Sequence, residues 1–190
     1  MTFAEQSTVD GYNCAEAASA MQKCIRRGLE MDALFWVTEL DRSNYGEYVW
    51  KRLRIIASED IGLADPLAAL SVRTLYENWK DQRKKDDTRH APERLFLVHA
   101  TQLLCRARKS RSVDHALVVH YEGARPKRDV PDFALDKHTG RGRARKRGWN
   151  HWWEEGCQLD RPKSVDQLAV DYEDTARLIR RDAQIELDLA

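Results

Sequence analysis

The sequence predicts an all-α protein: a multi-helix antiparallel array, followed by a basic irregular segment and a C-terminal helix. Three observations support this fold class. Apolar residues recur at i, i+4, i+7 and i+8 in one segment after another, which is the spacing of amphipathic helices. No strand-like alternation occurs before residue 117. The helical segments are separated by only a few residues, as is typical of antiparallel neighbours.

Composition and boundary signals divide the chain into four parts. Its 190 residues are 42% hydrophobic and 33% charged, with a net charge of +1, which fits a globular rather than a disordered protein. We expect a loose lead-in over residues 1–12, a helical domain over 13–123, a basic Gly/Arg/Trp segment over 124–160, and an amphipathic helix over 161–190. The last of these begins with a capping box and continues with a heptad-like seam, typical either of a coiled coil or of packing back on the bundle.

The compartment follows from what the sequence lacks. There is no signal peptide and no apolar run near 18 residues, so we expect a cytoplasmic protein that does not enter a membrane. The four cysteines form no C-x-x-C pair, which indicates reduced thiols and no zinc site. We expect no metal and no cofactor.

The first two helices have clear signals. Asn13 is a good N-cap, and Gly28 ends the helix that follows it. The next helix, about 30–41, is apolar nearly all round, which predicts a position in the middle of the bundle. Ser43 is expected to cap the third helix.

The third helix ends in a corner, residues 58–66, that is predicted to be structural. Gly62 can adopt a positive φ, Asp65 is placed to cap the next helix, and Pro66 suits its first turn. Glu59 and Asp60 lie beside the helix ends, where carboxylates favour capping and the helix dipole over catalysis.

Three further helices follow the corner. The first carries an apolar face that ends at Trp79, and the second a stripe from Phe96 to Ala107. A short helix capped by Ser112 is expected to point Val113, Ala116 and Leu117 inward and to end at Gly123.

The corner Ile55 to Pro66 resembles the C-terminal helical region of replication-associated recombination AAA+ ATPases, relatives of the Werner-helicase-interacting protein. Weaker similarity extends over roughly Gly11 to Pro131. The resemblance implies a clamp-loader-like collar with a family scaffold at Ser58, Glu59, Asp60, Gly62, Asp65 and Pro66. It also implies a homo-oligomer, with single-strand-binding protein or a AAA+ ATPase in trans as partners. The Gly-x-x-x-x-Gly-Lys-Ser/Thr loop of the family's ATPase domain is absent from these 190 residues.

The basic segment suggests binding of single-stranded DNA. Cationic side chains can neutralise phosphates, and flat indole rings can stack on unpaired bases. The residues expected to do so are Arg141, Arg143, Arg145, Lys146, Arg147, Trp149, Trp152 and Trp153. The alternative is structural: the tryptophans pack in the bundle and the arginines pair with the acidic C-terminal helix.

The function favoured by the sequence is a non-catalytic helical assembly and DNA-binding module in replication or recombination, without its own ATPase domain. One alternative is a metal-dependent nucleic-acid-processing enzyme that uses Asp136, His138, His151, Glu154 and Glu155, although these lack the His-Glu-x-x-His spacing. Another is a collar mimic that regulates a AAA+ ATPase.

Overall fold

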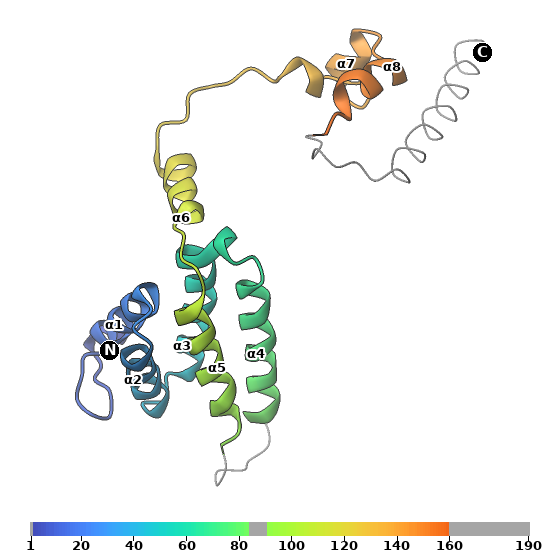
Figure 1. The fold of residues 1–190 in the computed structure, drawn as a ribbon. Coiled ribbons are helices and arrows are strands. Elements are labelled where there is room, and N and C mark those ends of the chain that lie inside the picture. The colour runs from blue at the N-terminus through green and yellow to red at the C-terminus, as the bar shows by residue number, and fades with distance from the viewer. Residues whose placement is uncertain (1, 84–90, 160–190) are drawn as a thin grey trace. The chain divides into compact units, whose positions relative to one another are not determined.

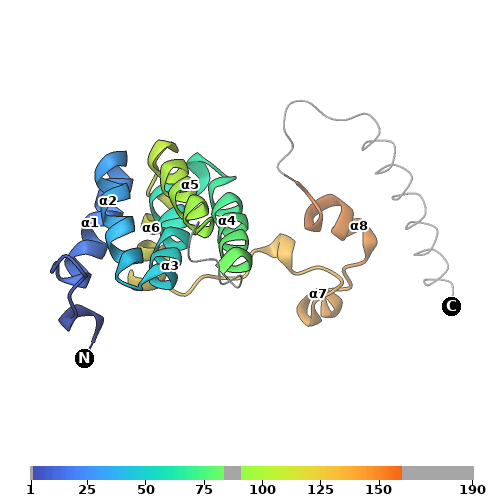
Figure 2. The ribbon, with the colours of Figure 1, turned by 90° about the horizontal axis from the view of Figure 1, so that it is seen from below.

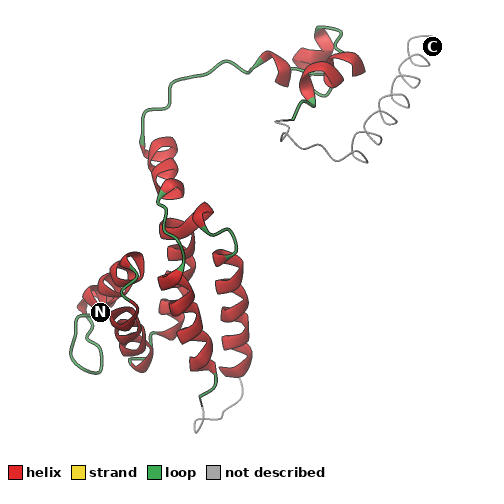
Figure 3. Ribbon diagram, viewed as in Figure 1, coloured by secondary structure: helices red, strands yellow, loops and turns green. Residues whose placement is uncertain are grey.

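The computed structural model describes residues 2–83 and 91–159. The chain divides into two compact units, Met1–Arg125 and Pro126–Ala190. Within the described residues there are helices and turns but no strand, and the only β-bridge joins Ser7 to Asn13 (Figure 3). The predicted all-α class is confirmed. The helix predicted for 161–190 lies outside the described residues.

Helix α1 spans Cys14–Arg27 and begins and ends as predicted. The Asn13 side chain accepts hydrogen bonds from the amides of Ala15 and Glu16, at 3.0 and 3.1 Å. Gly28 ends the helix in the left-handed conformation, with φ of 71°.

Helix α2, Glu30–Arg42, contacts α1, α3 and α5, as its predicted position in the middle of the bundle requires. It is not buried all round, because it buries Ala33, Val37 and Leu40, whereas Met31 on its other side is 80% exposed. The rings of Phe35 and Trp36 contact Tyr12 of the N-terminal segment.

Three further helices complete the bundle: α3, Gly46–Ile56, α4, Ala68–Arg83, and α5, Glu93–Arg106. Figures 1 and 2 show α3, α4 and α5 side by side, with the α1–α2 pair along one flank. The wide helical turn η2, Ala57–Ile61, and the tight turn η3, Gly62–Ala64, connect α3 to α4 and form the predicted corner.

Ser43 does not cap α3, which begins after Tyr45. Instead it ends α2, where its hydroxyl donates to the carbonyl of Glu39 at 2.7 Å and accepts from the amide of Val9 at 2.9 Å. This contact helps to hold the N-terminal segment.

The core of unit 1 is formed by the facing sides of α1 to α5. Trp50 and Trp79 are almost completely buried at its centre, with ring centroids 6.0 Å apart. Burial of each such large apolar side chain contributes roughly 1.5–3 kcal/mol or more to folding. The other large, fully buried apolar side chains include Met21, Ile25, Val37, Leu40, Val49, Leu53, Ile56, Ile61, Val72 and Leu104.

The lead-in is not loose. Phe3, in the turn η1, Phe3–Glu5, stacks on Tyr48 with ring centroids 4.2 Å apart. The amide of Asp10 donates to the buried carboxylate of Glu39 at 3.0 Å. Burial alone would raise the pKa of Glu39, but hydrogen bonds with Thr8 and Asp10 and the charge of Arg42 lower it.

Helix α6, Ser112–Leu117, continues into the wide turn η4, Val118–Glu122, before Gly123. The prediction that Val113, Ala116 and Leu117 point inward is wrong, because all three are exposed. Among the described elements, helix α6 packs mainly on the corner turns η2 and η3. Its apolar side is therefore left partly uncovered.

Unit 2 is built from short turns, as its glycines and prolines predict. The described elements are η5, Asp132–Ala134, α7, Gly140–Ala144, α8, Trp149–His151, and η6, Trp152–Gly156. The amide of Gly142 donates to Thr139 Oγ1 at 3.0 Å. A Cβ at Gly142 would lie 1.7 Å from the carbonyl oxygen of Asp136, so this backbone approach requires glycine. In the part of the chain described, no helix has the length and apolar character needed to cross a membrane.

Candidate functional site

The corner between α3 and α4 is organised around a buried carboxylate. Asp60 is completely buried. Arg26 Nε, from α1, donates to Asp60 Oδ1 at 2.5 Å, and Gln22 Nε2 donates to Asp60 Oδ2 at 3.3 Å. The hydrogen bond to Asp60 raises the pKa of Arg26. A buried carboxylate is tolerable only when it is paired in this way.

The same residue also holds the segment that leads into α6. The amide of Ser110 donates to the Asp60 carbonyl at 2.9 Å. Arg111 Nε lies 3.9 Å from Asp60 Oδ1, and Arg26 Nη2 lies 3.1 Å from Glu59 Oε1. Asp60 therefore connects α1, the corner and α6.

The capping role predicted for Glu59 and Asp60 is wrong, since both carboxylates pair with arginines from other elements. Asp65 is predicted to cap the next helix, but α4 begins only at Ala68; Asp65 Oδ1 instead accepts from the amide of Leu67 at 3.2 Å in the turn that precedes the helix. Pro66 lies in the same turn and Ser58 is exposed on η2.

Gly62 has the positive φ predicted for it, 50°, with ψ of −125°. This is a backbone conformation that essentially only glycine adopts. A Cβ at this position would lie 2.8 Å from Val113 Cγ2. Glycine is thus required twice, by the turn and by the close approach of α6.

In unit 2, two of the predicted phosphate-binding arginines hold the fold together. Arg147 Nη1 donates to the carbonyls of Asp132 and Leu135, each at 2.8 Å, and its Nη2 bonds the Asp132 carboxylate. Arg145 Nη1 donates to Asp132 Oδ1 at 2.6 Å. The bond from Arg147 is the main reason that the pKa of Asp132 is lowered.

The other three bases differ from this pair. Arg143 Nη1 donates to the carbonyl of His138 at 3.1 Å. The side chains of Arg141 and Lys146 are exposed and have no hydrogen-bond or ion-pair partner among the described residues. They are the members of the predicted set that are best placed to meet a phosphate.

The three tryptophans form one cluster within unit 2. The ring centroids of Trp149 and Trp152 are 5.4 Å apart, and those of Trp152 and Trp153 are 4.6 Å apart, each pair edge to face. Lys137 Nζ lies 3.5 Å from the centre of the Trp149 ring. All three rings are half-buried, so part of each indole remains open to solvent.

The residues of the alternative metal site do not converge. In the described ranges, no group of three or more His, Cys, Asp or Glu side chains could hold a metal ion. Asp136 Oδ2 instead lies 2.8 Å from His138 Nδ1, and this hydrogen bond lowers the pKa of Asp136. Both ring nitrogens of His151 are buried and have no hydrogen-bond partner among the described residues.

The fold and the corner define a helical domain without a nucleotide-binding loop, organised around a conformationally required glycine and a buried acid. The family model described as MgsA AAA+ ATPase C terminal matches residues 30–154. The chain belongs to this family, and the resemblance derived from the corner is confirmed. A comparison with curated proteins gave no match.

The match corrects the extent of the resemblance. It continues beyond Pro131 to Glu154 and so includes the arginine and tryptophan segment, and it begins at Glu30 rather than at Gly11. The basic segment is therefore part of the family domain.

Sequence reasoning missed Gln22, Arg26 and Arg111 as partners of Asp60. They lie 38, 34 and 51 positions away along the chain. The sequence carried no direct signal for these pairs, because the need for a partner arises only from the burial of Asp60 itself.

Proposed function

We propose that this chain is a non-catalytic assembly and DNA-binding module that acts in replication or recombination. Its family is that of the helical C-terminal domain of recombination ATPases. The bound DNA would be single-stranded, and Arg141 and Lys146 would supply cations beside indole rings that offer stacking surfaces. A reducing, cytoplasmic location fits the four free thiols.

The observation that carries the DNA-binding part is a local excess of positive charge around the start of unit 2. Residues 125–147 contain nine Lys or Arg against three Asp. Asp132 is already engaged by arginines, and Asp136 by a histidine. The remaining bases include Lys127 and Arg128, both exposed. Such an excess of cations is the electrostatic signature of phosphate binding.

Self-association is supported by apolar side chains left on the surface of unit 1. Leu63, Leu67 and Leu70 are 76%, 67% and 63% exposed and lie close together in the chain, in η3, in the turn before α4 and in the first turn of α4. Exposed large apolar side chains that gather in one region are typical of interfaces between proteins. We place a second copy of the chain there, with single-strand-binding protein or a AAA+ ATPase in trans as further partners of the assembly.

The DNA-binding proposal is tested by fluorescence anisotropy with a labelled single-stranded oligonucleotide across a range of salt concentrations. We expect Arg141→Glu or Lys146→Glu to weaken binding and to reduce the salt slope by about one each. Arg73→Glu, which changes an exposed base of α4 by the same charge, should leave binding unchanged.

A chain that fails to bind the oligonucleotide at low salt, or that responds equally to all three changes, would refute DNA binding. The assembly part is measured separately by light scattering in the same buffer. Leu67→Ser with Leu70→Ser should reduce the mass of the particle, and a wild-type protein that is monomeric at every concentration would refute it.

A further inference from the structure

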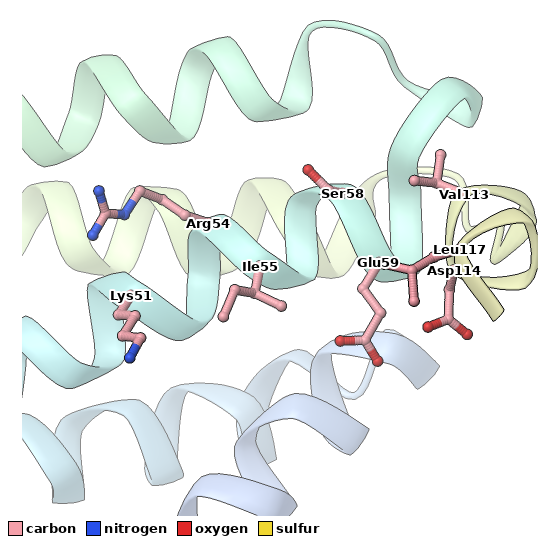
Figure 4. Close-up of a pocket in the computed structure, with 8 residues that line it drawn as sticks. All are labelled: Lys51, Arg54, Ile55, Ser58, Glu59, Val113, Asp114 and Leu117. Atoms are coloured by element: carbon pink, nitrogen blue, oxygen red, sulfur yellow. The ribbon is translucent and has the colours of Figure 1, made fainter. Parts of the chain in front are cut away.

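A groove of about 520 Å³ lies on unit 1 between α3, η2 and α6. This volume is within the range of roughly 300–1,000 Å³ typical of ligand sites. In Figure 4, Lys51 and Ile55 follow one another along α3, and α6 crosses the far end with Val113, Asp114 and Leu117. The remaining lining residues are Arg54, Ser58 and Glu59.

The floor of the groove is apolar and open. Ile55, Val113 and Leu117 are 37%, 38% and 51% exposed. Val113 is held against Gly62, so this part of the floor is fixed in position by the corner. A rigid apolar surface of this kind favours apolar side chains of a ligand, since their burial is the main source of binding free energy.

The charges around the floor are not balanced. Glu59 is bonded by Arg26 at 3.1 Å, and Asp114 by Arg111, so both acids already have cationic partners. Lys51 and Arg54 have no carboxylate partner among the described residues. Arg54 instead lies over the Tyr76 ring, 4.5 Å from its centre. The unsatisfied charge of the rim is therefore positive and is concentrated on the α3 side.

We propose that this groove is a docking site for an acidic segment of another protein that presents apolar side chains at helical spacing. The apolar side chains would occupy the floor, and the carboxylates of the segment would meet Lys51 and Arg54. A nucleic acid fits less well, because none of the eight residues that line the groove offers an aromatic ring for bases to stack on. The inference goes beyond the proposed function and does not depend on DNA binding by unit 2.

The test uses the full chain and a short fluorescein-labelled peptide in which leucines at helical spacing alternate with glutamates. Anisotropy should show saturable binding of this peptide and at least about tenfold weaker binding of the same peptide with lysine in place of glutamate. Lys51→Glu should weaken binding of the acidic peptide by about tenfold, and Leu117→Ser by a similar factor. Arg73→Glu on α4 is the charge-matched control and should change nothing.

The variants lie on the surface, and circular dichroism should show that they remain folded. Equal binding of the acidic and basic peptides, or binding that Lys51→Glu and Leu117→Ser leave intact, would overturn the proposal. Absence of any peptide binding would also overturn it. The DNA titration with Arg141→Glu is a separate measurement, so failure of one proposal is distinguishable from failure of the other.

Discussion

At the scale of single residues, Asp60 is the position on which most contacts in the corner depend. Its carboxylate has no exposure to water and is satisfied by side chains of α1, with a further arginine 3.9 Å away. Removal of one member of such a pair leaves the other buried without its partner. The resulting loss in the free energy of unfolding is larger than the net contribution of the intact pair.

We expect Asp60→Asn to lower the free energy of unfolding by about 1.5–3 kcal/mol. The loss of stability should be smaller than that for a fully buried ion pair, because the side chain of Arg26 is 30% exposed. Urea unfolding followed by circular dichroism measures the change. Glu59→Gln removes the more exposed pair between Arg26 and Glu59 and should lower the free energy of unfolding by less than about 1 kcal/mol. An equal loss in both variants would contradict the assignment.

Glu30 links α2 to α5 through a bidentate pair. Arg106 donates to its two carboxylate oxygens at 2.7 and 2.8 Å, and Gln102 donates to one of them at 2.9 Å. These bonds, that of Arg106 above all, lower the pKa of Glu30 from 4.5 to about 2.

This shift gives a pH dependence of known sign. Because the folded-state pKa is lowered, the contribution of Glu30 to stability is complete above its unfolded pKa and is lost as the pH falls through the folded value. The melting temperature of wild type should exceed that of Glu30→Gln near neutral pH, and the difference should shrink between pH of about 4.5 and 2. A difference that is constant over this window would contradict the pairing.

At the scale of elements, the close contact between the corner and α6 depends on Gly62. Its φ and ψ are unfavourable for any residue with a Cβ, and a Cβ would also contact Val113. The corner was predictable from sequence, whereas the approach of α6 to it was not.

Gly62→Ala should destabilise the protein by about 1–3 kcal/mol from the backbone alone, with a further cost from the contact with Val113. The double variant Gly62→Ala/Val113→Ala should recover only the part of the stability loss that comes from the contact with Val113. Gly11→Ala is a suitable control, because Gly11 also has a positive φ, 87°, but nothing lies within 4 Å of its Cβ position. Thermal unfolding of these three variants and of the wild type measures both parts. A loss for Gly62→Ala no greater than that for Gly11→Ala would contradict the predicted contact.

Two elements show where helical periodicity is insufficient. The apolar residues of α2 and α6 predict buried helices, yet Met31 and Leu117 are 80% and 51% exposed. Periodicity identifies a helix and its apolar face, but the number of neighbours available to cover that face depends on the whole bundle.

At the scale of the whole molecule, the main core that the structure describes lies in unit 1. Its buried residues extend from Ala17 to Cys105, and none of the described residues of unit 2 belongs to this cluster. Unit 2 has its own organisation, in which Leu135 is buried and Asp132 is held by two arginines.

A fragment of residues 1–125 should therefore fold alone, because it retains the complete core cluster. We expect a cooperative thermal transition by circular dichroism, with a midpoint close to that of the full chain. The full chain measured under identical conditions is the control. An unfolded or much less stable fragment would show that residues 126–190 support the core.

The sequence by itself determined the all-α class, the bounds of α1, the corner at Gly62 and the family, because these depend on local propensity, capping and a contiguous motif. Only the tertiary structure decided which bases are free. Arg145 and Arg147 have the same local signal as Arg141 and Lys146, yet the first two are bonded to Asp132. It likewise decided that Asp60 pairs with Arg26, and that α6 leaves an apolar groove with a basic rim. Pairing and burial depend on residues far apart in the chain, whose proximity follows only from the packing of all the helices.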